Sequence, residues 1–167
     1  MRHPRVADLH GLLSALLEAD VELIVVGGAA AILHGSSTTT QDLDVVHRRT
    51  PENVARLLAV LSRLDATIRE PGHRGLRPDE NLLLRGQQPL LSTTLGDLDT
   101  LCILHDGRGY EELLPRSVEM QVDDRPLRVL DLDTLIEVKA AANRPKDRVV
   151  LPILLALREQ QARDRLK

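Results

Sequence analysis

The sequence predicts an α/β fold, taken broadly to include α+β, in which a small mixed sheet is flanked by helices. Strand-like and helix-like segments alternate early in the chain, a short run of strands follows, and helical segments close it. At 167 residues the chain can bury one sizeable core but is short for two complete domains. We therefore expect one domain over residues 1–130, with a C-terminal helical extension over residues 131–167 packed on it.

Hydrophobic spacing predicts the first elements. Leucines recur at helical spacing over residues 5–19, which indicates an amphipathic helix. The apolar run over 21–28 stops at a glycine pair, as expected for a strand covered on both faces. A short helix should follow and end at Gly35, and "DLDVVHR" over 42–48 should return as a strand.

The later elements are predicted from caps, turns and breaks. Thr50 and Pro51 form a good helix start for "TPENVARLLAVLSRL". Proline and glycine over 70–80 indicate an exposed loop, and one or two strands interrupted near Gly96 should follow. Beyond them we expect three further features: a short helix in "GYEELLPR", a hairpin around "DDRP", and two helices broken at Pro145.

Composition excludes several classes of function. Aromatic residues make up 1% of the chain, with Tyr110 the sole example, so a stacking platform for single-stranded nucleic acid is absent. The net charge of −3 gives no general attraction to phosphate backbones. Cys102, the single cysteine, excludes an internal disulfide and a cysteine-based zinc cluster. Without a run of roughly 18 to 20 apolar residues or a secretion signal, we expect a cytoplasmic protein that does not enter a membrane.

Two aspartates interrupt an otherwise apolar strand. Asp42 and Asp44 are two residues apart, so on a strand they project from the same face. Two close carboxylates repel one another unless a positive charge lies between them, and hard oxygen ligands favour Mg²⁺ or Mn²⁺. The alternative is that Asp42 caps a turn and Asp44 is a solvated strand residue.

A glycine pair precedes them in the chain. Gly27 and Gly28 lie where a buried strand meets a helix, and a missing Cβ there lets a phosphate approach backbone N–H groups. A tight strand-to-helix turn is the alternative. An anion site beside a dication site is what a nucleoside triphosphate with magnesium requires.

These motifs together resemble a known family. "VGGAAAILHG" followed by "TTTQDLDVV", with thirteen residues between Gly28 and Asp42, is similar to the signature of the nucleotidyltransferase superfamily typified by DNA polymerase beta. More narrowly, residues 21–50 resemble small bacterial nucleotidyltransferases often encoded in toxin–antitoxin or abortive-infection pairs. Many of those proteins have an arginine where this chain has Thr38, which is a departure from the pattern. The resemblance implies a nucleotidyltransferase-like catalytic domain over residues 1–130.

The resemblance also implies a two-metal mechanism with a third carboxylate on a later strand. "TTLGDLDTL" offers Asp99, with Asp97 in reserve as a residue that could instead belong to a turn. Asp42 and Asp44 would ligate both ions, and Asp99 would complete the site of the ion that activates the acceptor hydroxyl. Gly27, Gly28 and the following amides would hold the β- and γ-phosphates.

The remaining nucleotide-binding candidates are a threonine and a basic cluster. Thr40 ends a run of hydroxyl residues that could contact phosphate or satisfy a turn. The chain uses far fewer lysines than arginines, so a lysine at a particular position is notable. The segment "LIEVKAAANRPKD" is similar to a C-terminal motif of the same bacterial family. We expect Lys139 to contact triphosphate or acceptor, with Arg144, Lys146 and the adjacent Asp147 as a secondary group; a solvated helix end is the alternative.

The sequence therefore predicts a metal-dependent nucleotidyltransferase that binds ATP or another NTP and transfers NMP to a hydroxyl acceptor. RNA such as tRNA, a protein or a small molecule could be the acceptor. The family resemblance implies a toxin with a cognate antitoxin, and it is compatible with a dimer. Two alternatives stay open: an inactive nucleotidyltransferase-fold module that binds nucleotide or protein, and an antitoxin-like partner subunit.

Overall fold

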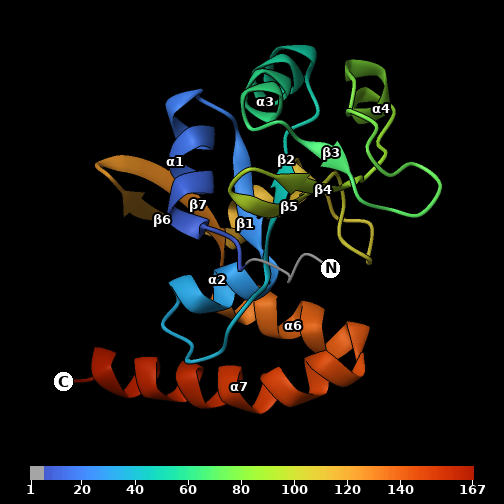
Figure 1. Cartoon of the computed structure of the whole chain (residues 1–167). Coiled ribbons are helices and arrows are strands. Elements are labelled where there is room, and N and C mark those ends of the chain that lie inside the picture. The colour runs from blue at the N-terminus through green and yellow to red at the C-terminus, as the bar shows by residue number, and fades with distance from the viewer. Residues whose placement is uncertain (1–5) are drawn as a thin grey trace.

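A computed structural model describes residues 6–167, and a seven-stranded mixed sheet runs through it in the order β3-β4-β5-β2-β1-β7-β6 (Figure 1). The strands are β1 Leu23–Val26, β2 Asp42–His47, β3 Thr67–Ile68, β4 Leu90–Thr93, β5 Gly96–Leu101, β6 Ser117–Val122 and β7 Arg125–Leu130. The helices are α1 Leu9–Glu18, α2 Gly27–Leu33, α3 Pro51–Arg63, α4 Glu80–Leu84, α5 Tyr110–Leu113, the 3₁₀ turn η1 Leu114–Arg116, α6 Leu132–Ala142 and α7 Pro145–Arg165. The predicted α/β class with a mixed sheet is confirmed.

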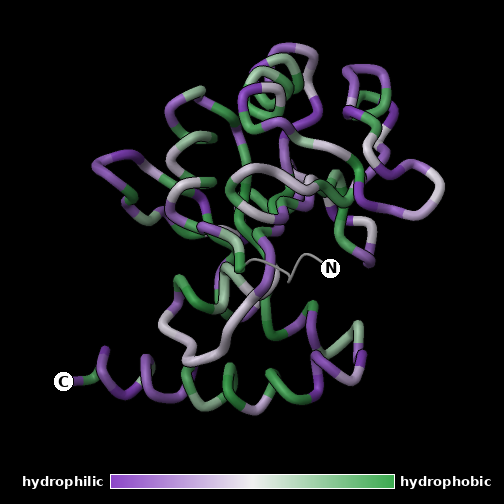
Figure 2. The backbone as a smooth tube through the Cα atoms, viewed as in Figure 1, coloured by the Kyte–Doolittle hydropathy of each residue, from purple (hydrophilic) through white to green (hydrophobic). Residues whose placement is uncertain are grey.

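The central strands show why the sheet is mixed. β1 pairs antiparallel with β2 and parallel with β7, while β2 pairs parallel with β5. All four residues of β1 are buried, as expected for a strand covered on both faces. Figure 2 shows hydrophobic residues concentrated on this central strand, whereas the C-terminal part of α7 is hydrophilic.

Side chains of β2 alternate between the two faces of the sheet. Leu43 and Val45 are fully buried on the face that contacts α1. Asp42 and Asp44 point to the opposite face, where burial is only partial. Leu43 and Val45 therefore belong to the apolar core on the side of β2 opposite to the two aspartates.

The C-terminal helices pack together and against α2 (Figure 1). Asp131 caps α6 through a 2.7 Å hydrogen bond from the Thr134 amide, and Pro145 starts α7 after a break. Leu154 of α7 is fully buried, and the Gln161 side chain donates to the carbonyl of His34 at 3.0 Å. The two predicted helices are confirmed. No helix within residues 6–167 combines the length and apolar character needed to cross a bilayer.

The start of the first helix differs from the sequence prediction, whereas the strand break near Gly96 and the hairpin around "DDRP" are confirmed. α1 begins at Leu9 because Asp8 accepts a hydrogen bond from the Gly11 amide as its N-cap; the predicted residue 5 lies outside the described part. Gly96 opens β5 after a two-residue turn, so the interrupted segment is a hairpin of two strands. The second hairpin turns on Asp123 and Asp124, both at positive φ, a geometry typical of tight primed turns.

The predicted loop over residues 70–80 is exposed for most of its length, but it leads directly into α4. Asp79 accepts a hydrogen bond from the Leu82 amide and starts this helix. With five residues α4 is too short to show a helical period, which is why the sequence did not predict it.

Candidate active site

Four aspartates form a two-by-two array on one face of the sheet. β2 and β5 are parallel neighbours, with Asp42 opposite Asp97 and Asp44 opposite Asp99. Residues two apart on a strand share a face, so the register brings all four side chains to the same side. Asp97 lies within β5 and not in the preceding turn.

Three of these carboxylates converge. Asp42, Asp44 and Asp99 each offer an oxygen atom, and the three atoms lie within 4.8 Å of one another. Asp99 is 6% exposed, so burial fixes its position. Asp97 instead accepts a hydrogen bond from Ser92 Oγ at 3.1 Å. Of the two candidates for a third carboxylate, the geometry favours Asp99.

The electrostatics of this cluster favour a cation. Burial, together with the charges of Asp42 and Asp99, raises the pKa of Asp44 to about 7. Burial also raises the pKa of Asp99, although its hydrogen bonds to Arg69 oppose that shift. The cluster thus carries carboxylate repulsion that a hard divalent cation would relieve, and its all-oxygen donor set fits Mg²⁺ or Mn²⁺.

Arg69 is a site residue that sequence reasoning missed. Its guanidinium donates two hydrogen bonds to Asp99, from Nη1 at 2.7 Å and from Nη2 at 3.2 Å. Nη2 also lies 3.8 Å from Asp42 Oδ2, and Nε lies 3.6 Å from Asp97 Oδ2. No local sequence motif distinguishes Arg69 from the other arginines of the chain. Arg69 lies close to the aspartates because β3, β4 and β5 pair side by side in the sheet.

The glycine pair makes room for the acidic face. Gly27 has a φ of +64°, and a Cβ at that position would lie 2.6 Å from Asp44 Oδ2. A Cβ on Gly28 would lie 2.8 Å from Thr40 Oγ1. Thr40 Oγ1 in turn donates to the Asp42 backbone carbonyl at 3.0 Å. Both glycines and Thr40 therefore contact the residues that position the aspartates.

The start of α2 lies beside the acidic cluster. α2 begins at Gly27 itself, and its N-cap residue, Val26, supplies no side-chain hydrogen bond. The first amides of a helix have no partner within it, which makes this turn a candidate for meeting an anion. Val26 stands opposite Asp44 in the β1–β2 register, which puts the turn beside the acidic cluster.

The predicted basic cluster is organised around the buried carboxylate of Asp147. The Asp147 side chain is 1% exposed, with Lys139 Nζ 3.6 Å from Oδ1 and Arg144 Nε 2.7 Å from Oδ2. Burial raises the pKa of Asp147, but the Arg144 hydrogen bonds and the Lys139 charge outweigh it and hold the pKa below its usual value. Lys146 is exposed, and its charge lowers the pKa of Asp44. Two of the three predicted phosphate contacts are thus paired with Asp147, while Lys146 faces outward.

The histidines near these elements have other surroundings. His47 is buried on the face away from the aspartates, 3.7 Å from Cys102 Sγ, and burial lowers its pKa. His34 Nε2 lies 2.8 Å from the Leu130 carbonyl oxygen, which ties the end of α2 to β7. Neither histidine contacts the carboxylate cluster.

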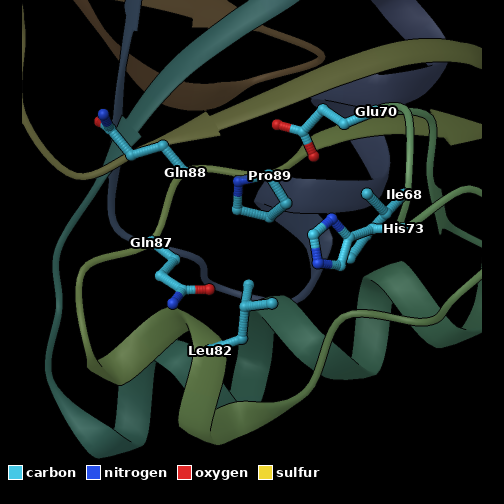
Figure 3. Close-up of a pocket in the computed structure, with 7 residues that line it drawn as sticks. All are labelled: Ile68, Glu70, His73, Leu82, Gln87, Gln88 and Pro89. Carbon is cyan, nitrogen blue, oxygen red and sulfur yellow. The ribbon is translucent and has the colours of Figure 1, made fainter.

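A cavity of about 340 Å³ lies between the turn after β3, α4 and the start of β4 (Figure 3). Its lining residues are Ile68, Glu70, His73, Leu82, Gln87, Gln88 and Pro89. None of the four aspartates lines it, so it is separate from the acidic site.

The fold is shared with solved structures of other proteins. The chain superposes with a TM-score of 0.54 on a crystal structure from Thermotoga maritima assigned as a nucleotidyltransferase, at 15% identity over 89% of this chain and 90% of the other. It also superposes with a TM-score of 0.53 on the solution structure of the antibiotic-resistance factor ANT(2'')-Ia, at 17% identity over 95% of this chain and 90% of the other. No protein-family model and no curated protein matches the sequence.

Proposed function

We propose that the protein is a metal-dependent nucleotidyltransferase that transfers NMP from an NTP, with ATP the first candidate, to a hydroxyl acceptor. The convergence of Asp42, Asp44 and Asp99 beside the Gly27 turn carries this proposal. The nucleotidyltransferase fold supports it, because the same sheet presents the acidic face and the glycine turn together.

Asp42 and Asp44 would hold both divalent ions, and Asp99 would complete the site of one. Two bound ions stabilise the attacking and leaving oxygens of an in-line displacement at the α-phosphate. The acceptor hydroxyl would lose its proton within the acidic cluster, and pyrophosphate would leave. Thr40 would keep the Asp42 backbone in place through its hydrogen bond.

The triphosphate would meet the amides of Gly27 and Gly28, whose backbones lie beside Asp44 and Thr40. Lys146 is the basic residue best placed to add a point charge, because it is exposed and acts electrostatically on Asp44. Lys139 and Arg144 would hold the α6–α7 junction through Asp147, and their direct contact with nucleotide stays a prediction.

The acceptor and the biological role rest on the resemblance of residues 21–50. It favours RNA such as tRNA, or a protein, as acceptor, and a toxin held in check by a cognate antitoxin. Because the chain shares its fold with an antibiotic-resistance factor, we also consider a small-molecule hydroxyl as the acceptor. A dimer is compatible with this role.

One observation favours a second candidate, a catalytically inactive module that binds nucleotide or protein. Arg69 already neutralises part of the acidic cluster, as an arginine would in a domain that needs no metal. Such a module would bind nucleotide without transferring it.

The test is incubation with each labelled NTP, Mg²⁺ or Mn²⁺, and total RNA, cell lysate or small-molecule alcohols. Asp44→Asn should abolish label transfer. Asp65→Asn makes the same chemical change at an exposed aspartate paired with Arg77, so it should transfer normally. Transfer that survives Asp44→Asn rejects the mechanism, and nucleotide binding without any transfer supports the inactive module.

A further inference from the structure

Arg69 holds the acidic cluster together in the way a cation would. It follows β3 at the edge of the sheet, and its amide donates to the Leu90 carbonyl at 3.0 Å. Leu90 stands opposite Asp99 across β4 and β5, so the arginine lies in the same cross-strand row as Asp99 and Asp44. Nη1 is further anchored by the Leu91 carbonyl at 2.8 Å.

This arrangement sets guanidinium and metal in competition. Arg69 donates to both oxygens of Asp99, and a metal that joins Asp42, Asp44 and Asp99 needs at least one of them. A guanidinium and a dication also repel one another when they share a carboxylate. The two cations therefore compete for the charge of the Asp99 carboxylate.

The displaced guanidinium has a chemically suitable second partner. Its planar fork of N–H donors matches phosphate as well as carboxylate. The phosphates of an NTP would arrive at the Gly27 turn, on the strand next to β2.

We propose that Arg69 is a counter-ion that a divalent metal displaces from Asp99 and that then binds the phosphates of the nucleotide. This inference rests on the proposed metal-dependent function and adds a role for a residue that the sequence motifs do not include. It makes the metal and the nucleotide bind cooperatively, since metal alone loses the Arg69 contacts while metal with nucleotide gives Arg69 new ones.

Two affinities test the exchange. Mn²⁺ binding is followed by electron paramagnetic resonance of the free ion, and binding of each α,β-methylene NTP is measured at saturating Mn²⁺. Arg69→Gln should bind Mn²⁺ alone roughly tenfold more tightly, because its competitor is gone, and bind the analogue roughly tenfold more weakly. The opposite signs are the diagnostic result.

Arg77→Gln is the matched control, because Arg77 lies on the same segment and pairs with the exposed Asp65. It should move neither affinity. Arg69→Lys keeps the charge without the fork and should fall between wild type and Arg69→Gln in both measurements. Circular dichroism melting establishes that each variant is folded at the assay temperature.

If Arg69 only orients Asp99 for the metal, the affinities for Mn²⁺ and for the nucleotide analogue should both fall in Arg69→Gln. That result, or no change in either affinity, overturns the inference. Mn²⁺ binding that is unaffected by Asp44→Asn shows instead that the ion is not held by the carboxylates, which rejects the proposed metal site and the inference with it.

Discussion

Gly27 leaves the space that the Asp44 side chain occupies: a Cβ on the glycine would lie 2.6 Å from Oδ2 of the aspartate. The glycine precedes the aspartate by seventeen positions, yet β1 and β2 pair so that Val26 stands opposite Asp44. The positive φ of Gly27 turns the chain away immediately after this pair. The glycine therefore does two things at once, since it permits the turn and leaves space for the carboxylate.

Gly27→Ala should lower both stability and activity. A positive φ alone costs an alanine about 1 kcal/mol, and the clash with Asp44 should bring the total to about 2–4 kcal/mol. Urea unfolding measures the loss. Gly75→Ala is the control, because Gly75 has a φ of +86° with open space around its Cβ position. Equal losses in the two variants contradict a steric role for the Asp44 contact.

Thr40→Val should reduce label transfer without unfolding the protein. The substitution removes the hydroxyl that donates to the Asp42 carbonyl at 3.0 Å and keeps the shape of the side chain. A looser Asp42 should lower kcat by roughly tenfold. Thr40→Ser should retain most activity, and Thr39→Val, at an exposed neighbour, should match wild type. Transfer at the wild-type rate in Thr40→Val rules out this positioning role.

The fold could be predicted where local pattern and tertiary structure agree. Thr50 and Pro51 start α3 as expected, because the Thr50 side chain accepts a hydrogen bond from the Asn53 amide. The helix break at Pro145 and the fully apolar strand β1 could also be predicted from the sequence. Local pattern failed at α4, where the helix is shorter than two turns, whereas the strand break predicted near Gly96 is confirmed.

The site could be predicted only in part, because its closest contacts depend on strand order. Spacing alone put Asp42 and Asp44 on one face, but only the parallel pairing of β2 with β5 shows that Asp99 joins them. Arg69 directly follows the edge strand β3, which is separated from β2 by β4 and β5, and no linear motif encodes this proximity. Asp147, predicted as a minor member of the basic cluster, is the buried centre of it.

Asp147 should make stability sensitive to acid. Its pKa lies below the ordinary 3.8 in the folded protein, so its ionised form stabilises the fold above that pH. This contribution is lost as the pH falls through the depressed folded pKa, since the folded state must then take up a proton. Asp147→Asn should cost roughly 2–4 kcal/mol at pH 7, because Lys139 and Arg144 lose their buried partner.

Urea unfolding of wild type and Asp147→Asn between pH 7 and pH 2.5 measures this contribution. The gap between the two proteins should shrink toward the acid end. Asp133→Asn, at an exposed aspartate paired with Arg158, should follow wild type throughout. A gap that stays constant with pH contradicts an electrostatic origin and points to packing alone.

Lys146→Gln should separate nucleotide binding from folding. Lys146 is exposed while its neighbour Asp147 is buried, so removing its charge should leave the unfolding midpoint unchanged. Losing one point charge near the triphosphate should weaken binding of α,β-methylene NTPs roughly tenfold.

Two other lysines provide the comparison. Lys139→Gln should lower the unfolding midpoint, because it removes one partner of the buried Asp147. Lys167→Gln, at an exposed lysine paired with Asp164, is the control for charge alone. Equal loss of nucleotide affinity in Lys146→Gln and Lys167→Gln would mean that net charge, and not the position of Lys146 beside the acidic cluster, governs the effect.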